Sequence, residues 1–571
     1  MKNQLVADIL YQIADLLDLK GENFFKTRAY RMAAQKIEVL EEDIGDLSKK
    51  DRLQEISGIG EALAKKINEI IETGKLGYLE ELKKEIPADL INLLNIPGLG
   101  PKKVAIIYKN LGISSLKELK KAANDGKLRN MEGFGEITEK NILRGIKLLE
   151  KTSGRVLLNI AYIDGFNYIK YLEKCKNIEK VNFAGSLRRM KETIGDIDIL
   201  ASSNNPDEVS KYFIKYPEVQ QILAKGTTKS SVILKDNIQV DLRVVEPKSF
   251  GAALQYFTGS KEHNVSLRSF AIKNGYKLNE YGLFNKNTEK FIVGKTEKEI
   301  YEKIGFSYIE PELRENRGEF EAAKSKNLPK LLGYNSILGD FHVHSLWSDG
   351  EDSIENLSFY AKKMGYSFIG ITDHSQSLKI ANGLSEERVD KKIQEIAKLN
   401  KKFSDFTILC GTECDIKIDG KLDYSDKTLK KFDFVYIGIH SGFKMDKNKM
   451  TDRIVNGMYN ENVNFLAHPT GRLIGKRDPY QMDIEKIIDT AKDTNTYIEI
   501  NAFPDRLDLD DSHCKFAKEK KIKFVLGTDS HSINHLSFIK FGIATARRGW
   551  LEKKDILNTC SIGEIKKILK I

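Results

Sequence analysis

The chain has 571 residues, 41% of them hydrophobic and 30% charged, with a formal net charge of +10. This length accommodates three to five domains, and no apolar run approaches the roughly 18 residues of a membrane span, so the composition predicts a globular, non-membrane protein. The five cysteines lack paired spacing, which favours reduced thiols in a cytoplasm over a disulfide framework. The excess of positive charge indicates a polyanionic partner, of which nucleic acid is the commonest.

The first 150 residues carry helical apolar periodicity and a repeated short turn. Gly, an apolar residue and Gly occur three times, each time before an amphipathic helix: Gly58-Ile-Gly60, Gly98-Leu-Gly100 and Gly133-Phe-Gly135. A turn of this kind presents backbone N–H groups to a phosphate oxygen without reading a base. A plain helix-ending glycine is the alternative. The pattern resembles the helix-hairpin-helix motif, which implies that these glycines bind the DNA backbone, with Na⁺ or K⁺ on the turn carbonyls.

Residues 1–85 also resemble the small N-terminal lyase domain of DNA polymerase beta. The similarity lies in Phe25–Arg31, Gly58–Ile67 and Thr73–Lys75. It implies that Lys66 forms a Schiff base with an abasic deoxyribose, and that Lys26 and Tyr30 contact a 5′-phosphate. Ala62 stands where that family has a further phosphate-binding lysine, so 5′-phosphate binding is favoured over lyase activity. A solvated helix lysine is the alternative for Lys66.

Two aspartates lie two residues apart in a strand-like stretch of the next segment. Ile197 and Ile199 fall on one face of the predicted strand, and Asp196 and Asp198 fall on the other. Two such carboxylates repel each other unless a divalent cation lies between them, which predicts a Mg²⁺-dependent nucleotidyl-transfer site. The preceding turn, Gly185–Arg189, offers a hydroxyl, free N–H groups and guanidinium charge to a polyphosphate. An exposed hairpin with ordinary surface charges is the alternative.

A second strand can complete this site. Ser231–Lys235 and Ile238–Val245 are predicted to form a hairpin, with an alternation that puts Asp241 on the polar face. If the strands are neighbours, Asp241 is the third carboxylate of a two-metal site, at which one ion activates a 3′-hydroxyl and the other holds a triphosphate.

The order and spacing of the motifs resemble those of the family X DNA polymerases. The motifs are Gly185-Ser-x-x-Arg189, Gly195-Asp-x-Asp198, Val240-Asp-Leu-Arg243 and Tyr256-Phe-Thr-Gly-Ser260, followed by Asn264, Arg268 and Asn279-Glu-Tyr281. The resemblance implies that Ser186 and Arg189, in the nucleotide-binding turns with Gly185 and Gly195, bind the β- and γ-phosphates. It further implies that the metal ions, Mg²⁺ or Mn²⁺, are bound by Asp196, Asp198 and Asp241.

The same resemblance assigns the rest of the nucleotide pocket. It places Tyr256 and Phe257 against the sugar, where Gly259 allows close approach, and it places Asn264 and Arg268 at the nascent base pair. Arg243 and Glu280 would form a pair that changes between open and closed states.

Two residues depart from the family pattern. Gln239 stands where polymerase beta has an arginine beside the catalytic aspartate. Lys261 replaces an acidic residue next to the incoming base, which adds positive charge to the nucleotide pocket.

Residues 336–571 follow a polar stretch, 319–335, that is predicted to be an interdomain linker. Seven apolar strand-like runs alternate here with helices, and six end in His, Asp or Glu: His342, His344, His374, Glu413, His440, His468, Asp529 and His531, with Asp349 in the loop after the first run. Side chains that converge from the ends of parallel strands are typical of a (β/α)-barrel active site. Six histidines and three acids without a thiolate suit a cluster of Zn²⁺, Mn²⁺ or Fe²⁺, whereas each histidine alone would be a core or surface residue.

This segment resembles the polymerase and histidinol phosphatase (PHP) domain. The matching motifs are His342-Val-His344, Thr372-Asp-His374, Gly438-Ile-His440, Ala467-His-Pro469 and Gly527-Thr-Asp-Ser-His531. The resemblance implies a trinuclear centre on the nine residues and metal-dependent hydrolysis of phosphoesters. Arg472 and Asp373 are weaker candidates for phosphate contact and for support of the ligands. His513 and His535 fall outside the pattern and are predicted to be surface residues.

The resulting fold prediction is a multidomain chain. It has all-α helix-hairpin-helix domains, an α+β nucleotidyltransferase palm with a small α/β thumb, and a C-terminal distorted (β/α)7 barrel. The predicted segments are 1–85, 86–150, 151–255, 256–318, the linker 319–335, and 336–571.

The predicted function is a monomeric DNA repair polymerase that adds dNTPs to a primer 3′-hydroxyl in short gaps. Its partners are gapped or primer–template DNA, and its barrel carries a separate 3′–5′ exonuclease or abasic-site phosphodiesterase activity, which suits base-excision repair. One alternative is a DNA-binding repair scaffold with inactive sites. Another is a PHP-type phosphatase that the N-terminal half targets to DNA.

Overall fold

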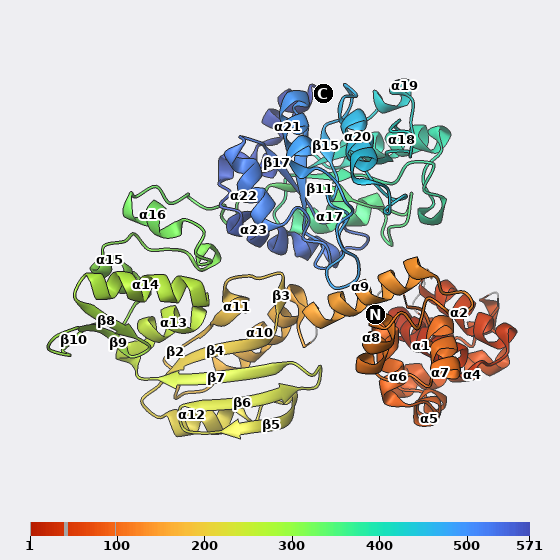
Figure 1. The fold of residues 1–571 in the computed structure, drawn as a ribbon. Helices are drawn as coiled ribbons and strands as arrows, with labels where there is room; N and C mark the ends of the chain where they lie inside the picture. Colours follow the sequence, from red (N-terminus) through yellow and green to blue (C-terminus); the bar gives the residue numbers. More distant parts are fainter. Residues whose placement is uncertain (1, 39–43, 57, 97–98, 153) are drawn as a thin grey trace. The chain divides into compact units, whose positions relative to one another are not determined.

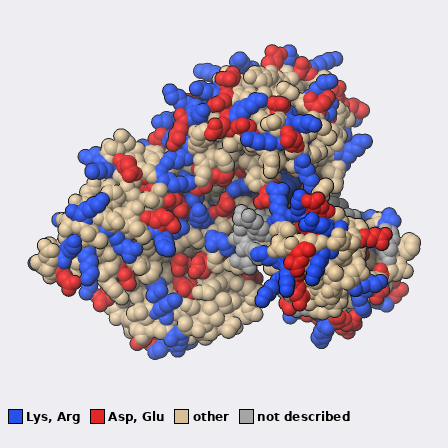
Figure 2. Space-filling model, viewed as in Figure 1, with Lys and Arg blue, Asp and Glu red and all other residues tan. Residues whose placement is uncertain are grey.

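The computed structural model describes residues 2–38, 44–56, 58–96, 99–152 and 154–571. These residues fold as two compact units, Met1–Ser153 with Gly475–Arg477, and Gly154–Ile474 with Asp478–Ile571. Among the described residues, no helix is long and apolar enough to span a bilayer. On the face drawn in Figure 2, basic and acidic side chains are interspersed over the surface.

The first unit is helical, as its periodicity predicts (Figure 1). Its helices are α1 (Lys2–Lys20), α2 (Phe24–Glu38), α3 (Ile44–Lys49), α4 (Glu61–Thr73), α5 (Gly77–Glu85), α6 (Ala88–Asn92), α7 (Pro101–Leu111), α8 (Leu116–Asn124) and α9 (Glu136–Thr152), with short 3₁₀ turns η1 (Leu53–Glu55) and η2 (Leu93–Asn95). One apolar cluster includes Leu10 of α1, Ile67 of α4, Ile107 of α7 and Ile146 of α9. Segments 1–85 and 86–150 therefore share a core.

The three Gly-x-Gly turns have a common hydrogen-bonding pattern. The N–H of the apolar middle residue bonds to the carbonyl three residues earlier: Ile59 to Ile56 (2.9 Å), Leu99 to Ile96 (3.0 Å) and Phe134 to Met131 (3.0 Å). Gly60 and Gly100 are the extended N-cap residues of α4 and α7, and Gly135 directly precedes α9. Gly58 and Gly133 adopt positive φ, and Gly98 lies outside the described residues. The shared pattern is that of a repeated structural motif.

The second unit begins with a five-stranded sheet in the order β2-β4-β7-β6-β5. The strands are β2 (Lys180–Phe183), β4 (Asp196–Ser202), β5 (Val219–Lys225), β6 (Lys229–Leu234) and β7 (Gln239–Val245), and a short β1 (Val156–Leu157) pairs with β3 (Thr193–Ile194). Helices α10 (Leu158–Leu172) and α12 (Pro206–Phe213) share an apolar cluster with Ile197, Ile199 and Val240 of the sheet. The predicted alternation is confirmed, because the isoleucines of β4 are buried while Asp196 and Asp198 on the other face are half-buried.

A smaller α/β subdomain follows. It contains η3 (Pro247–Ser249), α13 (Phe250–Thr258), α14 (Lys261–Lys273), the antiparallel strands β8 (Tyr276–Asn279), β9 (Gly282–Asn285) and β10 (Phe291–Val293), α15 (Glu297–Ile304) and η4 (Pro311–Leu313). A further helix, α16 (Glu319–Lys324), falls in the stretch predicted as a linker. Its Phe320 packs in the same apolar cluster as Leu267 and Ile300, and its buried Glu319 lies 2.7 Å from His263 Nδ1. Six residues are too few to show apolar periodicity in the sequence.

The C-terminal part of the second unit is a parallel barrel of seven strands in sequence order. The strands are β11 (Gly339–Val343), β12 (Phe368–Ile371), β13 (Thr407–Asp415), β14 (Phe434–Gly438), β15 (Phe465–Leu466), β16 (Tyr497–Asn501) and β17 (Phe524–Gly527). The first and last strands approach through a parallel bridge between Val343 and Ser530, so the sheet is nearly closed. The seven strands coincide with the seven predicted runs, which confirms the (β/α)7 prediction.

Helices surround these strands (Figure 1). They are α17 (Ile354–Lys363), α18 (Glu386–Lys402), α19 (Asp426–Leu429), α20 (Lys447–Met458), α21 (Ile484–Thr494), α22 (Asp511–Glu519), α23 (Ile539–Arg548) and α24 (Ile562–Leu569). Aromatic side chains from several strands pack in one cluster, which includes Phe341, Phe434, Tyr436 and Phe465. Because the Tyr436 ring also lies 4.8 Å from the His342 imidazole, this cluster forms an apolar floor beneath the histidines.

Candidate active sites of the palm and the barrel

Three aspartates meet on neighbouring strands of the palm sheet. Strands β4 and β7 are parallel, and their register puts Asp198 beside Asp241 and Asp196 beside Gln239. Since the three carboxylates alternate with buried apolar residues on both strands, all three project from the same face of the sheet. The structure therefore brings together the three residues that the sequence predicts as the polymerase metal ligands.

The crowding of these carboxylates perturbs their protonation. Burial, together with the negative charges of Asp196 and Asp241, raises the pKa of Asp198 to about 7. Burial and the Asp241 charge also raise the pKa of Asp196. Gln239 Nε2 donates a 2.8 Å hydrogen bond to Asp241, and Lys229 Nζ lies 3.7 Å from the same carboxylate. A divalent cation bound between these carboxylates would offset their mutual repulsion and stabilise their ionised forms.

The turn that the sequence predicts to bind phosphate lies directly against this cluster. The turn forms the short helix α11 (Gly185–Arg188) after β2, and Ala184 N–H bonds to the Asp198 carbonyl at 2.8 Å. Gly185 has φ +59°, and a Cβ at this position would lie 2.1 Å from Asp198 Oδ2. Only glycine allows the turn to approach the carboxylate so closely. Ser186, the next residue, is half-buried at the start of the turn.

Arg189, which the sequence assigns to the triphosphate, already has protein partners. Its Nε lies 3.0 Å from Glu315 Oε1, and its Nη1 donates to the Thr258 carbonyl. The preceding Arg188 points elsewhere, because it forms a bidentate pair with Glu297 at 2.8 and 2.6 Å. Of the two neighbouring arginines, Arg188 is therefore a structural residue, whereas the charge of Arg189 acts on Asp198 and opposes the rise in its pKa.

The other predicted nucleotide contacts come from α13 and α14. Asn264 Nδ2 donates to the Tyr256 carbonyl at 2.6 Å, and Arg268 Nε donates to the Asn264 carbonyl at 3.3 Å. The Arg243 guanidinium lies 5.0 Å from the centre of the Phe257 ring. Gly259 ends α13 with positive φ, and Lys261 begins α14 on the surface. Glu280, Arg243 and Phe257 line one cavity of about 550 Å³.

The lyase-like residues form a cluster within the first unit. Lys66 Nζ lies 3.7 Å from the centre of the Tyr78 ring and donates a hydrogen bond to the Tyr30 hydroxyl. Lys26 Nζ lies 5.8 Å from the same Tyr78 ring. Burial is the largest cause that lowers the pKa of Lys66. The structure thus brings Lys26, Tyr30 and Lys66 together and adds Tyr78, which the sequence does not single out.

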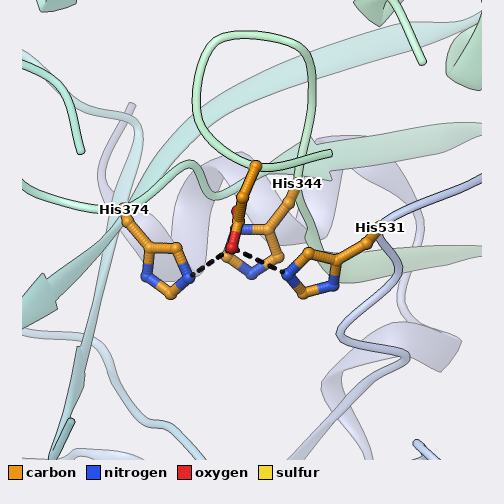
Figure 3. A group of neighbouring side chains, drawn as sticks. His344, His374 and His531 are labelled. Carbon is orange, nitrogen blue, oxygen red and sulfur yellow. Dashed lines mark ion pairs between the residues drawn. The ribbon is translucent and has the colours of Figure 1, made fainter. Parts of the chain in front are cut away.

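The barrel gathers its histidines and acids into three overlapping groups. Among the described residues, the groups able to hold a metal ion are His344, Asp349, His374 and His531; His342, His344 and Asp529; and His374, Glu413 and His440. Figure 3 shows the imidazoles of the first group around one carboxylate, and Asp349 lies 3.7 Å from His374 and 3.3 Å from His531. The ninth predicted ligand, His468, approaches the third group through a 2.7 Å contact with Glu413. All nine predicted ligands therefore converge.

Several imidazole nitrogens of the barrel have no hydrogen-bond partner, and this bears on whether the residues can bind metal ions. Nε2 of His342, both nitrogens of His344 and Nδ1 of His468 are buried and lack a hydrogen-bond partner. Buried polar atoms without partners are rare in native proteins, so nitrogens left free in a ring of carboxylates suit coordination. The residues present therefore fit a cluster of divalent ions.

The protonation of the histidines follows from their burial and neighbours. Burial lowers the pKa of His344 to about 4, and so does the proximity of His374 and His531. Burial also lowers the pKa of His468 to about 4. His440 is half-buried, and the charges of Glu413 and Asp415 outweigh the effect of burial and raise its pKa to about 9. Neutral imidazoles are the form that binds metals.

Glu499 is a buried acid that the sequence analysis misses. It lies on β16, the one run without a predicted ligand, and its Oε1 is 2.6 Å from His342 Nδ1. Its other oxygen accepts the His468 backbone N–H at 2.6 Å. It therefore orients two predicted ligands, as carboxylates behind metal-binding histidines do. The signal in the sequence is an acid inside an otherwise apolar run.

Asp373 supports the loop that carries His344. It lies 2.8 Å from the ammonium of fully buried Lys392 and accepts hydrogen bonds from the Ser345 N–H and hydroxyl. Lys392 is also missed by the sequence analysis. Arg472, in contrast, donates to Glu192 and to two backbone carbonyls, so its guanidinium is committed to the protein.

Two further histidines were expected on the surface. His513 pairs with Asp510 at 2.5 Å on α22. Both differ from the expectation, because each is half-buried, and His535 Nδ1 also accepts the His531 backbone N–H at 3.3 Å. His535 therefore supports the backbone of a predicted ligand.

Comparison with known proteins agrees with both halves of this architecture. The helix-hairpin-helix domain matches residues 1–76, a SAM-like helix-hairpin-helix tandem matches 90–148, the DNA polymerase beta thumb matches 253–315 and the PHP domain matches 340–503. The chain is 39% identical over 572 residues to the DNA polymerase/3′-5′ exonuclease PolX of Bacillus subtilis (strain 168), and the match covers 100% of both chains. The chain belongs to the family X DNA polymerases with a C-terminal PHP domain.

Two other relatives match only part of the chain. DNA polymerase lambda of Rattus norvegicus is 28% identical over 290 residues, which cover 46% of this chain and 48% of that protein. A probable phosphatase of Thermoanaerobacter sp. (strain X514) is 28% identical over 242 residues, which cover 40% of this chain and 94% of that protein. This family X polymerase thus combines two metal-dependent families, and its His/Asp clusters can bind metal ions.

Proposed function

We propose that this family X polymerase fills short gaps in DNA with dNTPs at the palm site and trims 3′ ends at the barrel site. The observation that carries the proposal is the register of β4 and β7, which places Asp198 beside Asp241 next to the Gly185 turn. The full-length match to a DNA polymerase/3′-5′ exonuclease supports both activities. In this proposal the protein acts as a monomer in the cytoplasm and takes part in base-excision repair.

Each residue of the palm site has a role in this proposal. Asp196, Asp198 and Asp241 would hold two Mg²⁺ or Mn²⁺ ions, and such ions would supply charge neutralisation for the triphosphate and acidity for the primer 3′-hydroxyl. Gln239 fixes the orientation of the Asp241 carboxylate by its 2.8 Å hydrogen bond. Arg189 moves from its protein acceptors to the phosphates when a nucleotide binds.

The sugar and base of the dNTP meet other residues. Tyr256 and Phe257 pack against the sugar, and Gly259 leaves room beside them. Asn264 and Arg268 face the nascent pair, and Lys261 adds positive charge near the base. Their shared position on α13, which adjoins the carboxylate strand β4, and on the next helix α14 supports this arrangement.

The barrel site is proposed to bind three ions of Zn²⁺, Mn²⁺ or Fe²⁺ through the nine convergent ligands. Bound ions there supply Lewis-acid activation for phosphoester hydrolysis. The protein fixes the orientation of the ligands, since Glu499 holds His342 and Asp373 holds the loop after β11. The aromatic floor beneath His342 excludes water from that side of the site.

A labelled gapped DNA tests the two activities against the alternatives. With Mg²⁺ and dNTPs, we expect one-nucleotide extension by the wild type and extension at background level by Asp241→Asn. Without dNTPs and with Mn²⁺, we expect shortening of the primer from its 3′ end. Absence of both reactions would support a scaffold, and hydrolysis of a small phosphate monoester in preference to DNA would support a phosphatase.

A lyase activity at Lys66 is a second proposal, which the lysine environment favours. A lysine whose pKa is lowered by burial is a better nucleophile at neutral pH, and Lys26 and Tyr30 beside it suit a 5′-phosphate. Borohydride should trap the wild type on DNA with a 5′-deoxyribose phosphate, and Lys66→Ala should abolish trapping. Equal trapping of both proteins would refute the assignment, and binding of 5′-phosphorylated DNA without trapping would leave only phosphate recognition. The Gly-x-Gly turns, with Na⁺ or K⁺, are proposed to hold the flanking duplex.

A further inference from the structure

Arg189 and the barrel helix α23 are linked through a shared carboxylate. Glu315 Oε1 lies 3.0 Å from Arg189 Nε and also 3.0 Å from Arg548 Nη1, at the C-terminal end of α23. The same Arg548 nitrogen donates to the Arg189 backbone carbonyl at 2.7 Å. One residue of the barrel thus contacts both the backbone and the acidic partner of a residue in the palm.

Arg548 is held firmly in this position. Its side chain is 4% exposed, and its other terminal nitrogen lies 2.6 Å from Asp511 Oδ2 on α22. Arg317 shares that aspartate at 3.0 Å, and Arg317 Nη2 donates to the Arg548 carbonyl. A guanidinium with so many charge-assisted bonds at fixed positions acts as a rigid part of the barrel.

The charge balance of Glu315 changes when Arg189 moves. Burial raises the pKa of Glu315, but Arg548, Arg189 and Lys191 outweigh burial and hold it below its ordinary value. If a triphosphate draws Arg189 away, Glu315 loses one of two close partners in a nearly buried site, with Lys191 only at 4.0 Å. Leaving a buried charge without its partner is costly, so the cation that remains decides how easily Arg189 can leave.

We propose that Arg548 is a positioning residue for nucleotide incorporation: it neutralises Glu315 and holds the Arg189 backbone, so that the Arg189 guanidinium is free to transfer to the triphosphate. The inference rests on the proposed role of Arg189 in phosphate binding. It makes the barrel a structural part of the polymerase site, apart from its own chemistry.

Arg547 provides a matched control. It is the neighbouring residue on α23, and it also reaches from the barrel to the thumb, where its Nε lies 2.7 Å from Glu312. It donates further to the Leu332 carbonyl but makes no recorded contact with Arg189 or Glu315 among the described residues. A general loosening of the barrel from the thumb would affect both arginine variants, whereas the proposed role belongs to Arg548 alone.

The test is steady-state incorporation of one dNTP on gapped DNA by the full chain. We expect Arg548→Met to raise the KM for dNTP about tenfold, the effect of one charge-assisted contact, with kcat within about twofold. Arg547→Met should leave the KM unchanged. Adding Glu315→Gln to Arg548→Met should return the KM part of the way to wild type, because the competing carboxylate charge is gone while the hydrogen bond to the Arg189 carbonyl stays lost. Hydrolysis of primer 3′ ends at the barrel site should be the same in all variants.

Each outcome bears on a different claim. If Arg189→Ala leaves the KM for dNTP unchanged, the proposed phosphate role of Arg189 is wrong. If Arg189→Ala raises it but Arg548→Met behaves like Arg547→Met, the inference about Arg548 is overturned. Should Arg548→Met not fold, Arg548→Lys keeps the charge and loses the forked donors, and it should raise the KM by a smaller factor. An unchanged KM in that variant, or no rescue by Glu315→Gln, would also overturn the inference.

Discussion

Removing one carboxylate from the palm site should stabilise the metal-free protein. In Asp198→Asn the neutral amide replaces a group whose pKa is raised to about 7 by burial and by Asp196 and Asp241. A raised pKa in the folded state means that the wild type keeps its full stability below the unfolded pKa of about 4 and loses part of it as the pH rises through 7. The variant has no carboxylate at this position, so it does not lose stability as the pH rises.

The expected gain in the free energy of unfolding follows from the shift in the pKa of Asp198. About three pKa units at about 1.4 kcal/mol each give about 4 kcal/mol at pH 8. Because Asp198 is only half-buried and water screens part of the repulsion, we expect about 2–4 kcal/mol. The difference between variant and wild type should be large at pH 8 and should nearly vanish at pH 4.

Calorimetric unfolding in the presence of a chelator measures this effect. Asp236→Asn is the matched control, because Asp236 lies on the exposed β6–β7 turn of the same sheet and its loss should change stability by a few tenths of a kcal/mol. At pH 8 the melting transition of Asp198→Asn should be higher than that of wild type by a few degrees, and added Mg²⁺ should close the gap. A variant that is less stable than wild type at pH 8, or equally shifted at both pH values, would refute the reasoning.

Three other substitutions probe the two sites. Gly185→Ala places a Cβ 2.1 Å from Asp198 Oδ2, so polymerisation should fall at least about a hundredfold while hydrolysis, measured on the same labelled primer, stays at the wild-type rate. Glu499→Gln removes the charge behind a barrel imidazole, so the affinity of the barrel for Mn²⁺ in a metal titration should fall about 10–100-fold, and an unchanged affinity would contradict its supporting role. Lys392→Met leaves Asp373 without its buried cation, so denaturant unfolding should show a loss of about 3–5 kcal/mol, most of which the added change Asp373→Asn should restore.

The palm site was predictable because strand alternation has a period of two. The pattern predicts Asp196 and Asp198 on one face of a strand and Asp241 on the polar face of another, and the pairing of β4 with β7 shows that the two strands are neighbours. The barrel ligands were found for a related reason, since parallel strands end at the same edge. Glu499 is not predicted in this way, because it lies inside an apolar run and the other acids and histidines lie at or after the end of theirs.

Contacts between distant segments could not be predicted in this way. Arg548 and Glu315 are separated by 233 residues, and no periodicity relates them. The helix α16 was likewise missed, since its burial depends on His263 and on the apolar cluster of the thumb instead of on its own pattern. The contact between the Tyr78 ring and the Lys66 ammonium also forms only when helices α4 and α5 pack against each other.

The central claim is that two separate metal centres carry opposite reactions on a primer end. One end-labelled primer–template, incubated with and without dNTPs in Mg²⁺ and Mn²⁺, tests it with wild type, Asp198→Ala and His440→Ala. The account predicts that Asp198→Ala abolishes extension and leaves shortening intact, and that His440→Ala does the reverse. Loss of both reactions in either folded variant would contradict the division into two sites.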